Sequence, residues 1–332
     1  MQFREIKTTE DAIEAMAIEV RDGKLSNGQY VGLVENKMKE IAQSEHAVAV
    51  SSGTMGLKIA LDAMGIRPGD MVIVPDITFV VCATVILELN AIPVFVDVDP
   101  VTYLLDMEST VRAVAVYSGK VKAIMAVRLG GEPIPEWVYG LGIPVIVDSA
   151  HSMDPLPPQA LACVYSFHPS KIVSGIEGGC IATNSAGDAE HARQLRCFGF
   201  LEGSRVATAL GYKAYMSNVS ACLIWHNLCT LPQNLAKRAH IRDLLNAKLG
   251  LNHQGLGMYM VLSKHWLTVI SKIPAIRHYP MTLSKMITGV QQSETASQLV
   301  DSLVSLPFHE HLTDGDVDLI CDTITGIRTI KD

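Results

Sequence analysis

Cysteine pairs of the kind that hold metals or build disulfide frameworks are missing from this sequence of 332 residues. Its seven cysteines form no C-x-x-C pair, so neither a zinc site nor a set of disulfides is indicated. We therefore expect reduced, buried thiols and no bound metal.

Blocks of basic residues are missing as well. The chain carries 27 Lys and Arg against 34 Asp and Glu, a formal net charge of -7. Because release of counterions from a polyanion requires clustered cations, we expect no nucleic-acid partner and no binding to a membrane surface. An anionic small molecule would have to be held by local groups.

The sequence also lacks a segment suited to a bilayer. The apolar run from Phe79 to Leu87 is too short to cross one, and the charged start "MQFREIKTTED" has no signal-peptide core. We therefore expect a cytoplasmic protein with no membrane partner.

What the sequence does have is a hydrophobic fraction of 48%, enough to bury a large core. Short apolar runs alternate with helical patterns from His46 onward, and this alternation predicts an α/β domain with a mostly parallel sheet covered by helices on both faces. The predicted strands are "AVAVSS", "MVIVP", "PVFVDV", "KAIMAV", "PVIVD", "CVYSF" and "CIATN".

The pattern changes after about residue 215 to longer helical stretches. We expect helices over "SNVSACLIWHNLCTL" and "MYMVLSKHWLTVISKI", a short "SLPF" segment, and a final helix over "DGDVDLICDTITGI". This organisation predicts a large domain over residues 1–228 and a smaller C-terminal domain over residues 229–332.

The segment "SSGTMG" would place a strand end, a glycine and a helix N-terminus in sequence. Free backbone N–H groups and hydroxyls there suit a phosphate. An ordinary helix cap at Thr54 explains the same residues. The segment lacks the glycine spacing of a dinucleotide-binding turn and the Gly-Lys-Ser/Thr of a P-loop, which disfavours a nicotinamide-dependent dehydrogenase.

The segment "PVIVDSAHS" places Asp148 directly after an apolar strand and His151 three residues later. The carboxylate would cap a helix or pair with a cationic ring nitrogen of a ligand, because a buried carboxylate without a partner is costly. His151 fits either a satisfied core position or a contact to that ligand.

The segment "SFHPSK" places Ser166 at a strand end and Lys171 in the turn that follows. Both side chains would reach one small molecule if that turn faces the same sheet edge. A solvated surface lysine is the plainer interpretation of Lys171.

Taken together, these segments resemble fold-type I pyridoxal-phosphate enzymes, and more closely the DegT/DnrJ/EryC1/StrS family of sugar aminotransferases. The landmarks are collinear from about residue 23 to about residue 324. They are "GKLSNGQ", "VAVSSGTMGLKIAL", "GIRPGDMVIVPDITFVVCATVI", "PVFVDVDPVTYLLD", "IPVIVDSAHS", "SFHPSK", "EGGCIATN", "GYKAYMSNVSA" and "SLPFHEHLTDGDVDLI". The resemblance implies a large domain with a seven-stranded sheet and a smaller C-terminal α/β domain.

By this resemblance Lys171 would be the catalytic residue and would bind pyridoxal 5'-phosphate covalently. Asp148 would hold the pyridine nitrogen protonated, so that the ring can act as an electron sink. The aromatic side chain of Phe79 would cover one face of the ring, and His151 would lie near it.

The other matching positions concern the phosphate group and the second subunit. Gly53, Thr54, Met55 and Ser166 would surround the phosphate. Because the active site of this family is shared between two subunits, the resemblance predicts a homodimer in which Lys213 approaches the phosphate from the partner chain.

The implied reaction moves an amino group from L-glutamate to a keto group of a nucleotide-linked sugar, with pyridoxamine 5'-phosphate as the intermediate form of the cofactor. Family dehydratases have a histidine where Lys171 stands, so the lysine favours transamination. Two alternatives stay open: another lysine-dependent reaction such as decarboxylation or aldol cleavage, and an inert protein that keeps the fold for binding or regulation.

The sequence departs from the family pattern at several points. The segment "GYKAYMS" lacks the arginine that the family usually has before "MS", and the stretch between His151 and Ser166 is short. Arg128 and Arg277 are candidates for binding anionic substrate groups, although a surface or ion-pair role explains each.

Overall fold

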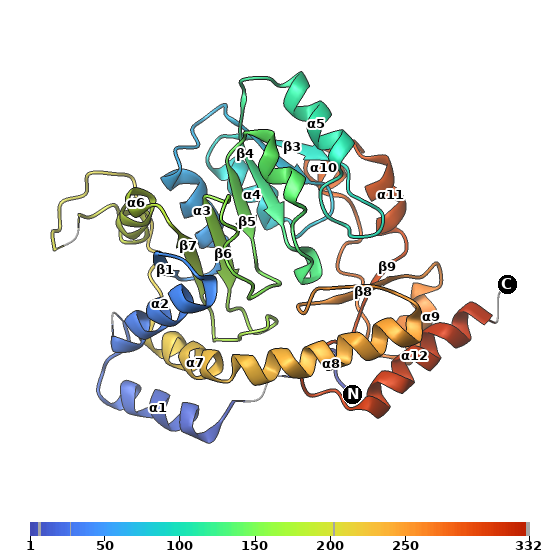
Figure 1. Cartoon of the computed structure of the whole chain (residues 1–332). Helices are drawn as coiled ribbons and strands as arrows, with labels where there is room; N and C mark the ends of the chain where they lie inside the picture. The colour runs from blue at the N-terminus through green and yellow to red at the C-terminus, as the bar shows by residue number, and fades with distance from the viewer. Residues whose placement is uncertain (6–7, 27, 202, 330–332) are drawn as a thin grey trace.

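The computed structural model describes residues 1–5, 8–26, 28–201 and 203–329 (Figure 1). Asn27, within the expected turn "GKLSNGQ", lies outside the described residues. In the described ranges no helix is both long and apolar enough to cross a membrane.

A seven-stranded sheet forms the centre of the larger part of the molecule. Its order is β1-β7-β6-β5-β4-β2-β3, and β7 runs against the other six strands. The strands are β1 His46–Val50, β2 Met71–Pro75, β3 Ile92–Val96, β4 Val121–Val127, β5 Val145–Asp148, β6 Ala162–Ser166 and β7 Gly179–Thr183. All seven coincide with the predicted apolar runs, so the predicted mostly parallel sheet is confirmed.

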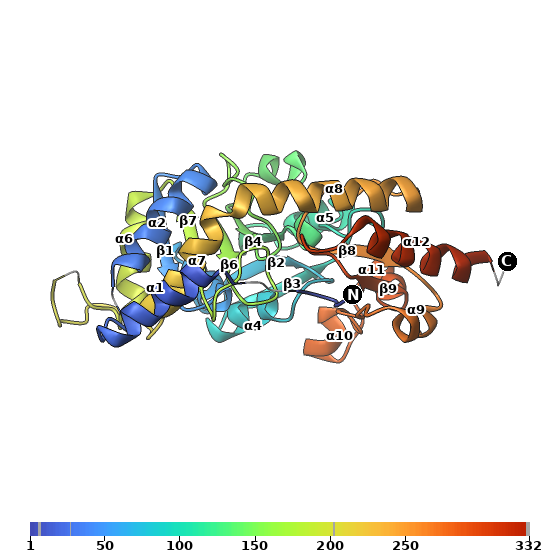
Figure 2. The same cartoon turned by 90° about the horizontal axis from the view of Figure 1, so that it is seen from below.

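Helices cover both faces of this sheet (Figure 2). Along β1, Val48 and Val50 belong to one buried cluster with residues of α3 and α4, while Ala47 and Ala49 belong to another with residues of α2 and α7. Because alternate residues of a strand point to opposite faces, both sets must be apolar, which explains the continuous apolar runs. Each fully buried Val or Ile contributes roughly 1.5–3 kcal/mol.

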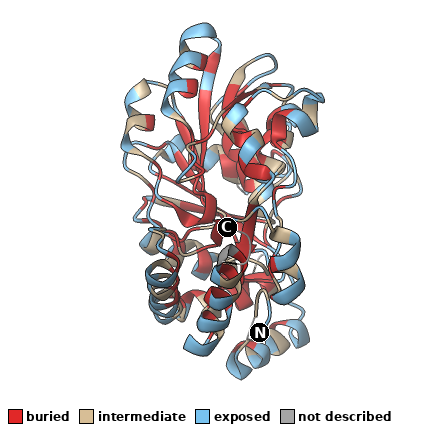
Figure 3. Ribbon diagram, turned by 90° about the vertical axis from the view of Figure 1, so that its right-hand side faces the viewer, coloured by how far each residue is buried: buried red, intermediate tan, exposed pale blue. Residues whose placement is uncertain are grey.

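The predicted alternation of strands and helices holds from β1 to α5, whereas only 3-10 helices separate β4 from β5, and β5, β6 and β7 follow one another without a helix. The strands are buried between more exposed helices (Figure 3). The α-helices are α1 Glu10–Arg21, α2 Gln29–Ala42, α3 Gly53–Ala63, α4 Val81–Glu88, α5 Met107–Val116, α6 Ala186–Arg196, α7 Asn218–Cys229, α8 Leu231–Leu249, α9 Trp266–Lys272, α10 Leu283–Thr288, α11 Glu294–Val300 and α12 Asp314–Thr329. Short 3-10 helices span Leu129–Gly131 and Glu136–Leu141.

The C-terminal part corrects one prediction. Instead of a single helix over residues 258–273, the chain forms strand β8 (Tyr259–Leu262) before α9. β8 pairs with β9 (Leu303–Leu306), about 40 residues later, in a two-stranded antiparallel sheet. An apolar run of this kind suits a buried helix or a strand equally, so the partner strand decided between them. The smaller α/β part is confirmed, and the domain boundary at residues 228/229 stays a prediction.

Candidate active site

One edge of the large sheet gathers the residues singled out in the sequence, because parallel strands end at the same edge. Asp148 is the last residue of β5 and lies beside Val127 of β4 and Val164 of β6. Ser166 is the last residue of β6, and Ser52 follows β1, which runs in the same direction as β6. The motifs therefore meet in space although more than 100 residues separate the first from the last.

A cavity of about 550 Å³ opens at this edge. Of the predicted site residues, seven line it: Gly53, Thr54, Phe79, Asp148, His151, Ser166 and Lys171. Met55 instead packs against the hydrophobic core. The exposed Lys213 lies outside this cavity, and its backbone forms an isolated antiparallel β-bridge with Cys197.

The N-terminus of α3 forms one end of the cavity. Ser52 caps the helix by accepting a hydrogen bond from the Met55 N–H at 3.2 Å, so the cap is Ser52 and not Thr54 as the sequence suggested. A Cβ atom on Gly53 would lie 2.9 Å from the Cβ of Ser166. Only glycine lets the helix terminus approach the end of β6 this closely, which brings hydroxyls and free N–H groups to one point.

Asp148 is buried at the floor of the cavity. Its Oδ1 accepts a hydrogen bond from the Ala150 N–H at 2.9 Å, and its Oδ2 accepts one from the Cys82 thiol at 3.3 Å. Burial raises the pKa of Asp148, and the hydrogen bond from Ala150 is the largest effect that opposes the rise. No ion pair to this carboxylate forms among the described residues, so Asp148 is suited to a cationic group of a ligand.

Lys171 extends into the same cavity from the turn after β6. The turn is closed by a hydrogen bond from the Lys171 N–H to the His168 carbonyl oxygen at 2.9 Å. Burial lowers the pKa of Lys171 from 10.5 to about 8, the charge of Asp148 opposes this, and the cation of Arg4 adds to it. The amine is thus much closer to its neutral, nucleophilic form at neutral pH than a surface lysine is.

His151 lines the cavity as a neutral ring. Its Nδ1 accepts a hydrogen bond from the Gly130 N–H at 3.3 Å, and since a backbone N–H can only donate, the ring proton is on Nε2. Burial lowers the pKa of His151 well below 6.5, and the cations of Lys171 and Arg4 lower it further. His151 therefore offers a fixed N–H donor.

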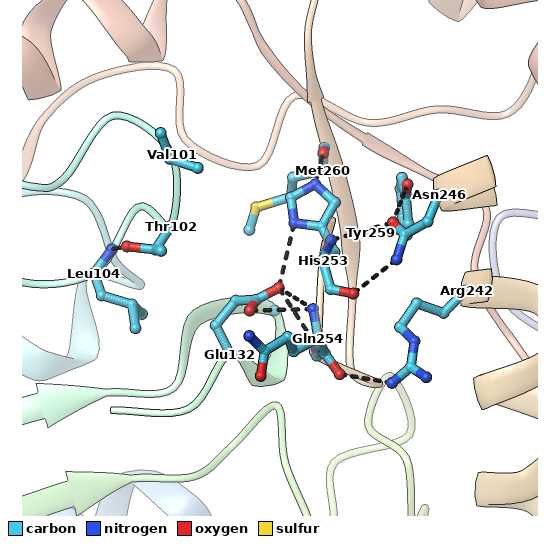
Figure 4. Close-up of polar contacts among 12 residues, drawn as sticks. Val101, Thr102, Leu104, Glu132, Arg242, Asn246, His253, Gln254, Tyr259 and Met260 are labelled. Carbon is cyan, nitrogen blue, oxygen red and sulfur yellow. Dashed lines mark hydrogen bonds and ion pairs between the residues drawn. The ribbon is translucent and has the colours of Figure 1, made fainter. Parts of the chain in front are cut away.

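The segment after β4, whose Gly130 donates to His151, continues into Glu132, which binds to the C-terminal part of the chain (Figure 4). The carboxylate of Glu132 accepts hydrogen bonds from the Gln254 N–H at 3.0 Å and from His253 Nδ1 at 3.2 Å. The other ring nitrogen of His253 lies 2.8 Å from the Met260 carbonyl oxygen. A buried carboxylate with several donors fixes its neighbours firmly, so the position of His151 depends on contacts between the two parts of the chain.

The wall opposite the sheet edge consists of residues that sequence reasoning missed. Arg4 comes from the N-terminal segment, and His278 and Tyr279 come from the connection between α9 and α10. No local pattern around these residues indicates a site. Cys82, the thiol partner of Asp148, had been assigned only to the buried thiols.

Neither arginine named as a candidate anion-binding residue lines this cavity. Arg128 is buried and donates hydrogen bonds to the carbonyl oxygens of Asp154 and Pro155 at 3.0 and 2.9 Å. Arg277 donates to the Val300 carbonyl oxygen at 2.8 Å and covers the Trp266 ring. Both have structural roles.

In the parts of the chain that the structure describes, no group of three or more His, Cys, Asp or Glu side chains is arranged to hold a metal ion.

Curated relatives of this chain are aminotransferases. L-glutamine:scyllo-inosose aminotransferase of Streptomyces griseus is 28% identical over 74% of this chain, and the match spans 62% of that protein's length. UDP-4-amino-4-deoxy-L-arabinose--oxoglutarate aminotransferase of Shewanella sediminis is 30% identical over 75% of this chain and 70% of that protein. UDP-2-acetamido-2-deoxy-3-oxo-D-glucuronate aminotransferase of Pseudomonas aeruginosa is 26% identical over 92% and 93%.

Solved structures share the whole fold. A DegT DnrJ EryC1 StrS aminotransferase from Brucella abortus superposes with a TM-score of 0.88 at 26% identity, over 96% of this chain and 95% of that one. NtdA from Bacillus subtilis, with bound cofactor PMP, gives 0.87 at 20% identity, over 99% and 87%. The family model matches residues 7–274, and this chain belongs to the DegT/DnrJ/EryC1/StrS aminotransferase family.

Proposed function

We propose that this aminotransferase uses pyridoxal 5'-phosphate to move an amino group from L-glutamate to a keto group of a nucleotide-linked sugar. The observation that carries the proposal is that Lys171 and Asp148 face one cavity whose other end is the N-terminus of α3. An amine, a buried carboxylate and a phosphate-binding helix terminus are the three groups that this cofactor requires.

The residues present fit the cofactor. Ser166, Thr54 and the α3 N-terminus at Gly53 would hold the phosphate, while Asp148 would pair with the ring nitrogen. The fit is supported by the state of Asp148, which is buried and forms no ion pair among the described residues. Its hydrogen bonds from Ala150 and Cys82 keep the carboxylate aimed into the cavity.

When bound, the cofactor supplies the electron sink that makes a C–H bond next to the amino group acidic. Lys171 would then hold and move the proton at that carbon, because a lysine with a pKa near 8 exchanges protons readily near neutral pH. His151 would donate its Nε2–H to the ligand from a fixed position, and Phe79 would cover the ring.

The names of the relatives support the substrate classes. Two relatives act on UDP-linked sugars by name, one of these names includes oxoglutarate, the keto acid of glutamate, and the relative from Streptomyces griseus names L-glutamine instead. A UDP-linked sugar is common to two of these names, and one of the two includes an oxo group on the sugar, which supports the acceptor class. The donor has weaker support, because oxoglutarate appears in one name and L-glutamine in another.

A homodimer with a shared active site is part of the proposal. Phe79 lines the cavity yet is 61% exposed, so its ring needs a cover. The segment between α6 and α7 projects away from the sheet (Figure 1) and carries Leu210, which is 94% exposed. Exposed apolar side chains on a projecting segment support a subunit contact, through which Lys213 of that segment would reach the partner's site.

The test is chemical. Protein incubated with pyridoxal phosphate is reduced with borohydride, and the modified peptide is identified by mass spectrometry. We expect one adduct, on Lys171, and we expect L-glutamate to bleach the absorption of the unreduced protein before a keto sugar nucleotide restores it. An adduct on another lysine would remove the chemical basis of the proposal. Release of CO2 from an amino acid without lasting bleaching would identify a decarboxylase instead.

A further inference from the structure

The N-terminal segment contributes a cation to the cavity. Arg4 lines the 550 Å³ cavity of the candidate active site together with Lys171, and the same two residues line a smaller adjoining cavity of about 170 Å³. The N-terminus lies near α12 and far from the projecting segment at the other end of the molecule (Figure 2). Arg4 therefore reaches the site from the side of the C-terminal part.

Contacts with the C-terminal part fix this segment. The Phe3 ring lies 5.5 Å from the His278 ring, centroid to centroid, and the Gln2 carbonyl oxygen accepts a hydrogen bond from His309 Nε2 at 3.2 Å. His278 is itself held by a 2.8 Å hydrogen bond between its Nδ1 and Ser305 Oγ. Residues 2 and 3 are thus anchored on both sides, and the next side chain, Arg4, is directed into the cavity.

The guanidinium of Arg4 has no anion of its own. Among the residues that the structure describes, it forms neither a hydrogen bond nor an ion pair, whereas the neighbouring Arg238 is paired with Glu310 at 2.8 Å. Burial, followed by the cation of Arg238, lowers the pKa of Arg4 to about 10, although Tyr279 and the more distant carboxylate of Glu310 oppose this, and Arg4 is still charged at neutral pH. Its one direct partner among the described residues is the Phe3 ring, whose centroid lies 5.7 Å from the guanidinium carbon. An aromatic ring supplies no full negative charge, so an anionic group of a ligand would stabilise this partly buried cation further.

The position of Arg4 selects the kind of anion. The phosphate of the cofactor is accounted for by the other end of the cavity, at Gly53 and Ser166. Arg4 is close enough to Lys171, His151 and His278 for its charge to lower the pKa of each. An anion at Arg4 would therefore sit next to the reacting carbon. An amino acid always carries a carboxylate there, and a keto sugar carries none directly beside its carbonyl carbon.

We propose that Arg4 binds the α-carboxylate of the amino-acid donor. This inference rests on the proposed aminotransferase function and adds to it the residue that recognises the donor. The planar guanidinium can hold both carboxylate oxygens at once, which fixes the orientation of the donor as well as its charge. The N-terminal segment would then bind substrate in addition to packing against the C-terminal part.

The test compares three variants with the wild-type protein: Arg4→Gln, Arg4→Lys and, as a matched control, Arg112→Gln. Arg112 is an exposed arginine on α5 whose ion pair with Glu108 is loose at 3.7 Å. The dissociation constant for L-glutamate in the first half-reaction is measured with each cofactor-loaded protein, and so is that for the α-amide of L-glutamate, which lacks the α-carboxylate.

We expect Arg4→Gln to weaken L-glutamate binding by about 10- to 100-fold, as for the loss of a charge-assisted hydrogen-bonded pair. Arg4→Lys should recover part of this loss, and Arg112→Gln should match the wild type. Binding of the α-amide should hardly change in Arg4→Gln. An equal loss for both compounds would overturn the inference, because Arg4 would then not contact the α-carboxylate. Loss of cofactor binding in Arg4→Gln would overturn it too.

A second readout does not depend on turnover. Borohydride-reduced protein holds the cofactor on Lys171 and transfers nothing, so calorimetry can measure its affinity for 2-oxoglutarate. Arg4→Gln should lower this affinity by a similar factor, and unchanged affinity would contradict the inference. A wild-type protein that holds the cofactor but accepts no amino donor would refute the proposed function, and the calorimetric comparison would still decide the role of Arg4.

Discussion

The two walls of the cavity come from different kinds of sequence. One wall is the edge of the seven-stranded sheet, where Asp148 and Ser166 end consecutive strands of the sheet and Lys171 follows in the next turn. The other wall joins Arg4 to His278 and Tyr279, which are more than 270 residues apart in the chain. The first wall consists of strand ends that short motifs describe. The second exists only because the N-terminal segment packs on the C-terminal part.

The two walls would therefore have different functions. The sheet-edge wall carries the groups that would hold the cofactor and perform chemistry, and the second wall carries the group that we propose to recognise the donor. Changes on the sheet edge should therefore abolish the reaction, while changes on the second wall should weaken donor binding and leave the cofactor in place. Variants on each wall test whether the division holds.

The largest effect is expected for Lys171→Ala. This change removes both the covalent attachment and the proton-transferring amine, so the transfer rate should fall by about 10⁴-fold or more, the upper end of what a general base contributes. Steady-state turnover and borohydride trapping measure the loss. Lys122→Ala, which alters an exposed lysine on β4, is the control and should behave as the wild type. Trapping that persists in Lys171→Ala would assign the attachment to another residue.

Asp148→Asn should have the next largest effect. An amide no longer stabilises a protonated ring nitrogen, and loss of one preorganised electrostatic contact of this kind costs about 10²- to 10³-fold in kcat. Turnover is compared with that of Asp301→Asn, which changes an exposed aspartate in the C-terminal part. A thermal unfolding curve separates a chemical defect from a folding defect. Wild-type turnover in Asp148→Asn would exclude a role of Asp148 at the ring.

The pH dependence of cofactor capture tests the environment of Lys171. Burial of the amine disfavours its charged form, so its pKa is lowered from 10.5 to about 8 and the neutral, reactive form predominates above that pH. We expect the rate of covalent capture to rise about tenfold per pH unit below 8 and to level off above it. A rate that keeps rising beyond pH 10 would show that Lys171 titrates like a surface lysine.

The smallest effect is expected on the second wall, for Phe3→Ala. The contact of Phe3 with His278 holds the segment that carries Arg4, and an aromatic pair contributes about 0.5–1.5 kcal/mol. Affinity for L-glutamate should therefore fall by about 2- to 10-fold, with unchanged affinity for pyridoxal phosphate. Phe3→Leu, which keeps an apolar side chain, should lose less. An equal loss of affinity for pyridoxal phosphate would contradict the claim that the second wall affects donor binding alone.

Much of the fold was predictable because local rules and tertiary structure agreed. All seven strands of the large sheet were apolar runs bounded by turns, and burial on both faces requires such runs. The prediction failed over residues 258–273, where β8 formed in place of the first part of a helix. That segment is apolar without a decisive period, and its pairing with β9 lies outside any local window.

The candidate site was predictable to the same extent. Asp148, Ser166 and Lys171 share a cavity because the first two end parallel strands at the same sheet edge and Lys171 stands in the turn after the second strand. Thr54 was assigned as the helix cap, but Ser52 is the cap, since either hydroxyl fits the local pattern and only the backbone geometry chooses between them. Roles that involve a second subunit, such as that of Lys213, stay predictions.

The sequence alone determined which strands form the sheet and which polar side chains stand at their ends, because both follow from the apolar runs and the turns between them. The tertiary structure alone decided that Arg4, His278 and Tyr279 complete the cavity, and that the hydrogen bond from Cys82 reaches Asp148. The physical reason is that a strand end is defined by its neighbours along the chain. A wall made by packing distant segments is defined only once those segments are in contact.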